Sequence, residues 1–121
     1  MLSRRTSKHR NIPVIIDGVR FDSKGEAARF QQLKLIELSG QISRLELKPK
    51  YEFMHNGQKF QTYTPDFQYF DETTKKTIVE DYKGHMKSED RRIKKMMKIF
   101  FSVDILYSGP ASRVSVKKNG S

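Results

Sequence analysis

The stretch Ile78-Val79-Glu80-Asp81-Tyr82-Lys83-Gly84, preceded along the chain by Pro65-Asp66, decides the fold. Its β-branched and aromatic residues predict a strand. Side chains alternate between the two faces of a strand, so Asp81 and Lys83 are expected on the same face. A carboxylate binds a divalent cation through oxygen, and a lysine orients or deprotonates a water and offsets charge on a phosphate. The pair therefore suits phosphodiester cleavage, with Asp66 as a second metal ligand.

The composition indicates one basic domain. The chain has 121 residues, enough for one hydrophobic core and too few for a second. Lysine and arginine number 24 against 14 acidic residues, which gives a formal net charge of +10. Such an excess favours a polyanionic partner, and nucleic acid is the simplest candidate.

The absence of cysteine excludes several classes of site. Without cysteine there are no disulfides, no thiol catalysis and no zinc or iron–sulfur centre bound by thiolates. The sequence has no apolar stretch long enough to cross a membrane, and its N-terminus lacks the apolar segment of a secretory signal. We therefore expect a soluble protein of the cytoplasm.

Charge and hydropathy divide the chain into three parts. Residues 1–11 are predicted to form a basic flexible arm, for which a solubilising role and a phosphate-binding role are both open. Residues 12–107 carry the periodic apolar pattern of the folded domain. Residues 108–121 are predicted to form a basic C-terminal tail.

Two helices are predicted. Ser23 and Glu26 form a capping box at the start of the first helix, which ends at Gly40. Ser88 is the predicted cap of the second helix, which carries an apolar stripe. The stripe consists of Ile93, Met96, Met97, Phe100 and Phe101. The opposite face is basic and is the predicted DNA-binding surface, with a purely solvated face as the alternative; it consists of Arg91, Arg92, Lys94, Lys95 and Lys98.

Several strands are predicted between and after the helices. Asn56-Gly57 is a hairpin turn that pairs Tyr51–His55 with residues 58–64. Residues 67–70 and 77–83 form two further strands, and residues 103–107 form a closing strand. The order of helix, three or four strands, helix and strand predicts an α/β fold with a mixed sheet. We expect its parallel pair at the sheet centre and helices on both faces.

These motifs resemble the PD-(D/E)XK nuclease superfamily over residues 20–107, most of the chain. The resemblance implies a restriction-endonuclease-like α-β-β-β-α-β core. More narrowly, the chain is similar to small phage and prophage endonucleases. The residues that carry this likeness are Phe21-Asp22-Ser23-Lys24 with Glu26-Ala27, Gly40-x-Ile42, Asp66-Phe67 with Tyr69, and Val79-Glu80-Asp81-x-Lys83-Gly84.

The resemblance implies a metal-dependent endodeoxyribonuclease. Asp66 and Asp81 would bind Mg²⁺, with Mn²⁺ as a substitute, Glu26 would complete the acidic cluster, and Lys83 would be catalytic. The products would end in 5′-phosphate and 3′-hydroxyl. Branched DNA such as a Holliday junction is the expected substrate, which implies DNA recombination and a homodimer that makes two matched incisions. The likeness also implies a phage or prophage protein in the cytoplasm of a bacterial host.

Other interpretations of the same residues stay open. Glu26 also fits helix capping alone, and Asp81 with Lys83 also fits an exposed ion pair. Glu80 is expected on the opposite face of the strand, as a structural or outer-sphere group. At the level of function, the alternatives are a sequence-specific or nicking endonuclease with the same site and a non-catalytic basic DNA-binding protein.

Overall fold

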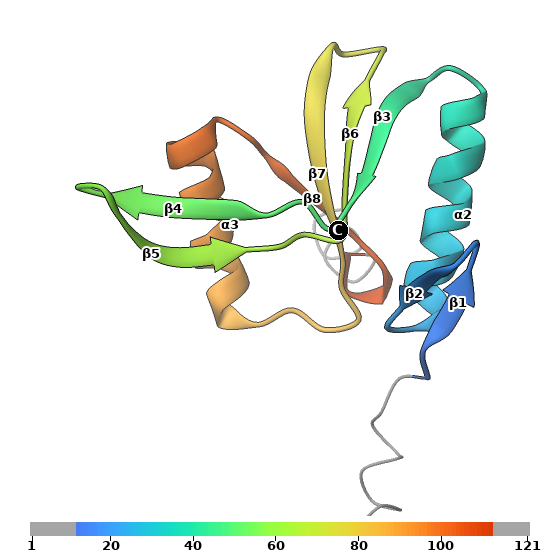
Figure 1. Ribbon diagram of the computed structural model, residues 1–121, viewed down its shortest axis with the longest axis horizontal. Helices are drawn as coiled ribbons and strands as arrows, with labels where there is room; N and C mark the ends of the chain where they lie inside the picture. Colours follow the sequence, from blue (N-terminus) through green and yellow to red (C-terminus); the bar gives the residue numbers. More distant parts are fainter. Residues whose placement is uncertain (1–11, 113–121) are drawn as a thin grey trace, which may run out of the picture.

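The structure, a computed structural model, describes residues 12–112 (Figure 1). The arm expected at residues 1–11 and most of the expected tail lie outside this range. Among the described residues, no helix is long and apolar enough to span a membrane. The elements in chain order are β1 (Val14–Ile16), β2 (Val19–Phe21), α2 (Lys24–Leu38), β3 (Ile42–Leu47), β4 (Tyr51–His55), β5 (Gln58–Tyr63), β6 (Phe67–Asp71), β7 (Lys76–Tyr82), α3 (Ser88–Phe101) and β8 (Ile105–Ser108).

A four-stranded mixed sheet is the centre of the fold, as the sequence predicts. Its strand order is β3-β6-β7-β8, and β7 and β8 are the parallel pair. The expectation that this pair lies at the sheet centre is wrong, because β8 forms the edge of the sheet in the part of the chain that is described. Within residues 12–112, no strand pairs with the free side of β8.

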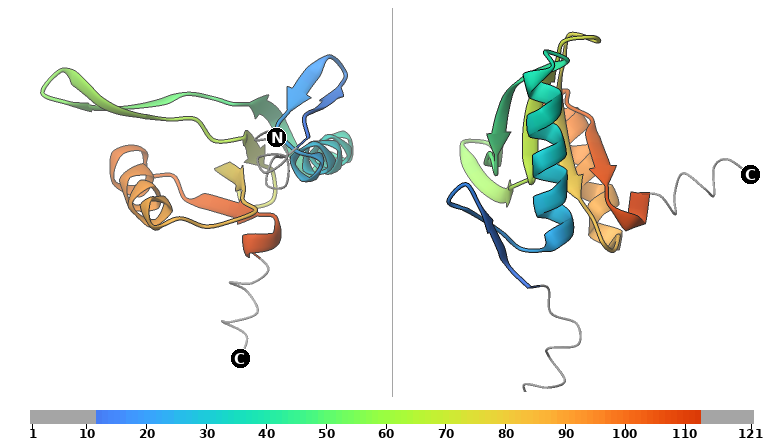
Figure 2. Two further views of the ribbon diagram at one scale, coloured as in Figure 1. Left: turned by 90° about the horizontal axis from the view of Figure 1, so that it is seen from below. Right: turned by 90° about the vertical axis from the view of Figure 1, so that its right-hand side faces the viewer.

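The two helices cover opposite faces of this sheet (Figures 1 and 2). Alternation along β7 separates two apolar clusters. Ile78 packs on the cluster that contains Phe30 and Leu33 of α2, whereas Val79 belongs to the cluster that contains Ile93 and Met97 of α3. Residue 80 is therefore directed to the α2 side and residue 81 to the α3 side.

The hairpin of β4 and β5 forms as the sequence predicts, with positive φ angles at Asn56 and Gly57. It does not join the central sheet and instead forms a two-stranded ribbon of its own. Phe53 on this ribbon is fully buried and packs 5.3 Å from Phe100 and 5.6 Å from Phe101 between ring centroids. The end of α3 thus covers the apolar face of the ribbon, which extends beside that helix in Figure 1.

Helix α2 begins after its predicted cap Ser23, and α3 begins one residue earlier than expected. Lys87 rather than Ser88 is the N-cap residue of α3. Its backbone N–H donates to Asp90 Oδ2 at 2.7 Å, so a carboxylate in the first turn caps this end. β8 is likewise shifted from the predicted residues 103–107 and includes Ser108.

Candidate active site

The register of β6 and β7 brings the two predicted metal ligands together. Phe67 pairs with Glu80 in this antiparallel ladder, so Asp66 lies opposite Asp81. The backbone N–H of Asp66 donates to Asp81 Oδ1 at 3.3 Å. The backbone N–H of Tyr82 donates to Asp66 Oδ2 at 2.8 Å. Both carboxylates are therefore positioned by the ends of the two central strands.

Lys83 lies on the same side as Asp81, as the one-residue spacing predicts. Its Nζ is 3.5 Å from Asp81 Oδ2 and 3.2 Å from Asp90 Oδ1, so the ammonium bridges a strand and the first turn of α3. The backbone is also held, since Lys83 N donates to Ser108 O at 2.8 Å. Gly109 packs on this backbone with φ +93°, and a β-carbon there would lie 2.7 Å from Lys83 O.

Glu26 reaches the same region from the first turn of α2. Ser23 Oγ accepts the Glu26 backbone N–H at 3.2 Å, which caps the helix. The Glu26 carboxylate itself lies 3.4 Å from Lys48 Nζ, and this ammonium is 3.7 Å from Asp66 Oδ1. The approach of α2 to β7 requires Gly25, because a β-carbon there would overlap the hydroxyl of Tyr82.

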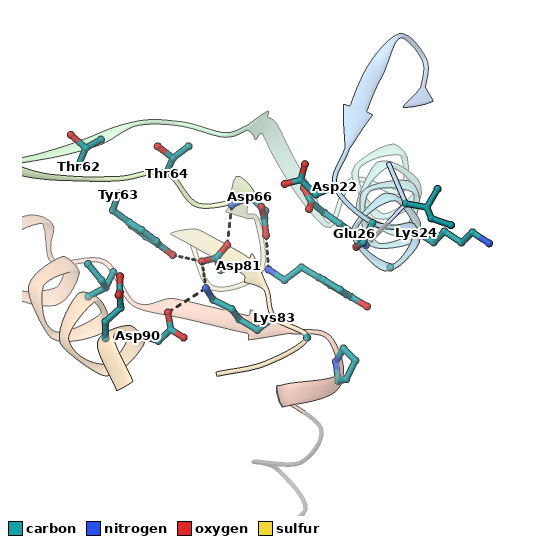
Figure 3. Close-up of a pocket in the computed structure, with 18 of the residues that line it drawn as sticks. Asp22, Lys24, Glu26, Thr62, Tyr63, Thr64, Asp66, Asp81, Lys83 and Asp90 are labelled. Carbon is teal, nitrogen blue, oxygen red and sulfur yellow. Dashed lines mark hydrogen bonds and ion pairs between the residues drawn. The ribbon is translucent and has the colours of Figure 1, made fainter. Parts of the chain in front are cut away.

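A cavity of about 790 Å³ contains all four predicted site residues (Figure 3). It lies between the first turns of α2 and α3. The start of β6 and the C-terminal ends of β5 and β7 form the rest of its wall. Its two basic residues are Lys24 and Lys83, and the formal balance of the lining is −4. In a chain with net charge +10, this acidic cavity is a local exception. The six acidic side chains that line it are Asp22, Glu26, Asp66, Asp81, Glu89 and Asp90.

Burial and like charge perturb the central carboxylate. Burial, then the hydrogen bond to Asp81 and the charge of Asp81, raise the pKa of Asp66 to about 8. The hydrogen bond that Asp66 accepts from the Tyr82 backbone N–H acts in the opposite direction and is the weaker effect. Asp66 therefore holds its proton more tightly than an isolated carboxylate would.

The two polar neighbours of Asp81 stay protonated. Burial alone would lower the pKa of Lys83, but Asp81 and Asp90 outweigh burial and the net shift of this pKa is upward. Burial and the adjacent Asp81 carboxylate raise the pKa of Tyr63 well above its ordinary range. The Tyr63 hydroxyl donates to Asp81 Oδ2 at 2.9 Å. Asp81 Oδ2 therefore faces one cation and one neutral hydrogen-bond donor.

The donor set suits a hard divalent cation. Asp66 and Asp81 offer carboxylate oxygens on one cavity wall, and their mutual repulsion favours a bound cation. Within residues 12–112, no three histidine, cysteine, aspartate or glutamate side chains lie together closely enough to form a complete metal cluster. Lys48 Nζ already stands between Glu26 and Asp66. The residues therefore fit a divalent cation in their charge and in their oxygen donors. The Glu26 carboxylate is paired with the Lys48 ammonium in this structure.

Glu80 is directed away from this cavity, as the alternation predicts. It is fully buried and accepts from Arg29 Nε at 2.5 Å, Arg29 Nη2 at 2.9 Å, Tyr69 Oη at 2.7 Å and Ser108 Oγ at 2.7 Å. Arg29 lies one helical turn after Glu26 on α2. The pair therefore fixes the helix that carries Glu26 against the strand that carries Asp81.

The predicted DNA-binding residues are exposed on α3 and lie outside the cavity lining. Arg92 Nη1 donates to Gln61 Oε1 on β5 at 2.8 Å, and Lys98 Nζ lies 3.3 Å from Asp104 Oδ2. Lys94 Nζ lies 5.6 Å from the centre of the Tyr107 ring. Arg91 and Lys95 complete this basic face. This face of α3 is thus basic and solvent-accessible. Arg92 and Lys98 also contact neighbouring parts of the fold.

Lys48, Tyr63 and Asp90 contact the predicted site residues, and the sequence analysis did not select them. Lys48 follows β3 and reaches Asp66 only because β3 pairs with β6, which no local pattern specifies. Tyr63 is the last residue of β5, and an aromatic residue in a strand resembles a core residue. Asp90 carries a detectable signal, since an acidic residue in the first turn of a helix is a capping candidate.

A family model matches residues 6–108 of the chain. The matching family is described as "Protein of unknown function (DUF1064)". Neither the curated proteins nor the solved structures contain a significant match to this sequence. The match spans most of the chain, including both helices and the residues Glu26, Asp66, Asp81 and Lys83. The chain therefore belongs to the DUF1064 family.

Proposed function

We propose that this protein is a metal-dependent endodeoxyribonuclease of the PD-(D/E)XK superfamily. The observation that carries the proposal is the placement of Asp66 beside Asp81 by strand register, with Lys83 on the same side in an acidic cavity. Two carboxylates and a cation at one end of adjacent strands are the groups that metal-assisted phosphodiester hydrolysis needs.

The order of elements supports a restriction-endonuclease-like core. Without the β4–β5 ribbon, the sequence from α2 onward is α2, β3, β6, β7, α3 and β8. This order is α-β-β-β-α-β, with a mixed sheet and one helix on each face. The three acidic positions then lie on the first helix, immediately before β6 and on β7.

The proposed division of labour follows from the contacts. Asp66 and Asp81, with Glu26, would hold Mg²⁺, for which Mn²⁺ would substitute. When bound, the cation polarises a phosphoryl oxygen and makes water a better nucleophile. Lys83 remains an ammonium, so it offsets the negative charge that builds on the phosphate rather than acting as a base. Asp90 and Tyr63 position Lys83 and Asp81 respectively.

The proposed substrate is DNA, with a preference for branched forms. The net charge of +10 attracts a polyanion, whereas the acidic cavity repels one until cations neutralise it. Because the chain is basic and the cavity is acidic, we expect both the catalytic step and the approach of DNA to the cavity to depend on a metal ion. A homodimer would make the two matched incisions that a four-way junction requires.

Incubation of the purified protein with a four-way junction, a matched linear duplex and single-stranded DNA tests the proposal. Each substrate is given Mg²⁺, Ca²⁺ or EDTA, and the products are resolved on a denaturing gel. We expect cleavage of the junction with Mg²⁺, binding with little turnover with Ca²⁺, and no cleavage with EDTA. Preferential cutting of the linear duplex at fixed sequences would favour the sequence-specific endonuclease. DNA binding with no cleavage in any metal would favour the non-catalytic protein.

A further inference from the structure

We propose that Lys48 is a resident cation of the candidate site, which joins Glu26 to Asp66 in the metal-free protein and competes with a divalent cation for both carboxylates. The inference deepens the proposed function and rests on it, because it concerns how the same metal site is loaded. It gives a role to a residue that is not among the predicted site residues Glu26, Asp66, Asp81 and Lys83.

Two separate contacts hold Lys48 beside Asp66. Its backbone N–H donates to Asp66 O at 3.0 Å, which extends the ladder between β3 and β6 past the Leu47 and Phe67 pair. Its Nζ is 3.7 Å from Asp66 Oδ1 and 3.4 Å from Glu26 Oε2. The backbone contact does not depend on the ammonium, so Lys48 would stay in position when its side chain moves away.

The exposure of the three groups favours an exchangeable contact. The Lys48 side chain is 42% exposed, whereas the side chains of Glu26 and Asp66 are 7% and 16% exposed. The ammonium is therefore more accessible to water than either carboxylate. By contrast, the Arg29 side chain is only 23% exposed and donates two hydrogen bonds to Glu80. Lys48 has the contacts of a displaceable cation, and Arg29 those of a fixed one.

Competition follows from charge and space. A divalent cation bound by Glu26 and Asp66 would occupy the oxygens that the Lys48 ammonium now faces, and two cations at the same oxygens repel each other. Lys48 would also prevent repulsion between the two carboxylates before metal arrives. Removal of the Lys48 charge should therefore lower the stability of the metal-free protein and raise its affinity for metal. These two effects have opposite signs.

Titration of Mn²⁺ into the EDTA-treated and desalted full-length protein, followed by calorimetry, tests this competition directly. Lys48→Met keeps the length of the side chain and removes the charge. We expect it to bind Mn²⁺ about fivefold more tightly than the wild type, a change of about 1 kcal/mol. Lys48→Arg retains a cation and should bind within about twofold of the wild type.

Lys75→Met is the matched control, because it removes the same charge from an ion pair with Glu72 at the other end of β7. It should also bind Mn²⁺ within about twofold of the wild type. In EDTA, Lys48→Met should have a lower melting temperature than Lys75→Met, and saturating Mn²⁺ should raise its melting temperature by more than that of the wild type.

The outcomes separate this inference from the proposed function. Tighter binding in Lys48→Met, with both control variants close to the wild type, supports the competition. Equal or weaker binding in Lys48→Met, or the same gain in Lys75→Met, overturns it and leaves the wild-type metal site intact. If Lys48→Met does not fold, Lys48→Gln replaces it under the same expectations. Absence of saturable Mn²⁺ binding in the wild type overturns the proposed metal site itself.

Discussion

Glu80 and Asp81 are adjacent carboxylates on β7, and both are buried, with exposures of 0% and 6%. Glu80 faces α2, where four hydrogen bonds and the Arg29 guanidinium compensate its charge. Asp81 faces the cavity, where it meets a second carboxylate and an ammonium that Asp90 shares.

The difference between the two carboxylates lies in their partners and not in their burial. On the α2 side the charges are paired in a closed network, which stabilises one arrangement of helix and strand. On the cavity side there is an excess of negative charge, which is a cost to folding that a bound cation would offset. We infer that the α2 face of β7 maintains the fold and that the cavity face performs the chemistry.

The largest expected effect is loss of cleavage from the cavity face. Lys83→Met and Asp66→Ala should each lower the single-turnover rate on a four-way junction by about 1,000-fold, because each removes charge from the reacting centre. DNA affinity should change by less than about twofold, since it depends on many phosphate contacts. Lys75→Met, which removes a surface lysine paired with Glu72, is the control and should keep its rate.

The next effect concerns stability on the α2 face. Glu80→Gln should lower the free energy of unfolding by about 3 kcal/mol, because it leaves the partly buried Arg29 without its counter-charge. Glu52→Gln removes the carboxylate of an exposed pair with Lys59 and should cost less than about 0.5 kcal/mol. Urea unfolding of both variants measures the contrast. Equal, small losses would show that the network on the α2 side does not stabilise the fold.

A third prediction uses pH to separate the faces. The pKa of Asp66 is raised in the folded protein, so between about pH 4 and pH 8 the folded state binds more protons than the unfolded state. Stability in EDTA should therefore fall as pH rises through this window. Asp66→Asn removes that loss and should be more stable than the wild type at pH 8, and not at pH 4. A constant difference across the range would contradict this prediction.

The smallest expected effect concerns the basic face of α3. Arg91→Gln with Lys95→Gln should weaken DNA binding several-fold and reduce the slope of affinity against salt by about one for each lost phosphate contact. The unfolding free energy should stay within about 0.5 kcal/mol. Lys75→Gln with Lys76→Gln changes the same charge at the far end of β7 and serves as the control. Unchanged affinity and slope would indicate a merely solvated face.

Local patterns were sufficient for the elements themselves. Ser23 and Gly40 bound α2 as predicted, and Asn56-Gly57 forms the hairpin turn, because capping and turn preferences depend on a few neighbouring residues. The one-residue spacing of Asp81 and Lys83 likewise placed both on one side of β7. These features depend on local backbone geometry, which short sequence patterns are sufficient to predict.

Arrangements that depend on distant packing were not predictable in the same way. The ribbon of β4 and β5 leaves the central sheet because α3 covers Phe53, and alternation alone does not say which element covers a strand. The contact of Lys48 with Glu26 requires the pairing of β3 with β6. Tyr63 reaches Asp81 only through the position of that ribbon.

The comparison of Asp81→Asn with Glu80→Gln in one cleavage experiment tests the central claim most directly. The substitutions are adjacent, remove the same charge and preserve the size of each side chain. Single-turnover cleavage of a four-way junction is measured with saturating Mg²⁺, at a temperature where circular dichroism shows both variants folded. We predict at least about a 1,000-fold loss for Asp81→Asn and less than about a tenfold loss for Glu80→Gln. Near wild-type cleavage by Asp81→Asn, or an equal loss in folded Glu80→Gln, would contradict the division between the two faces.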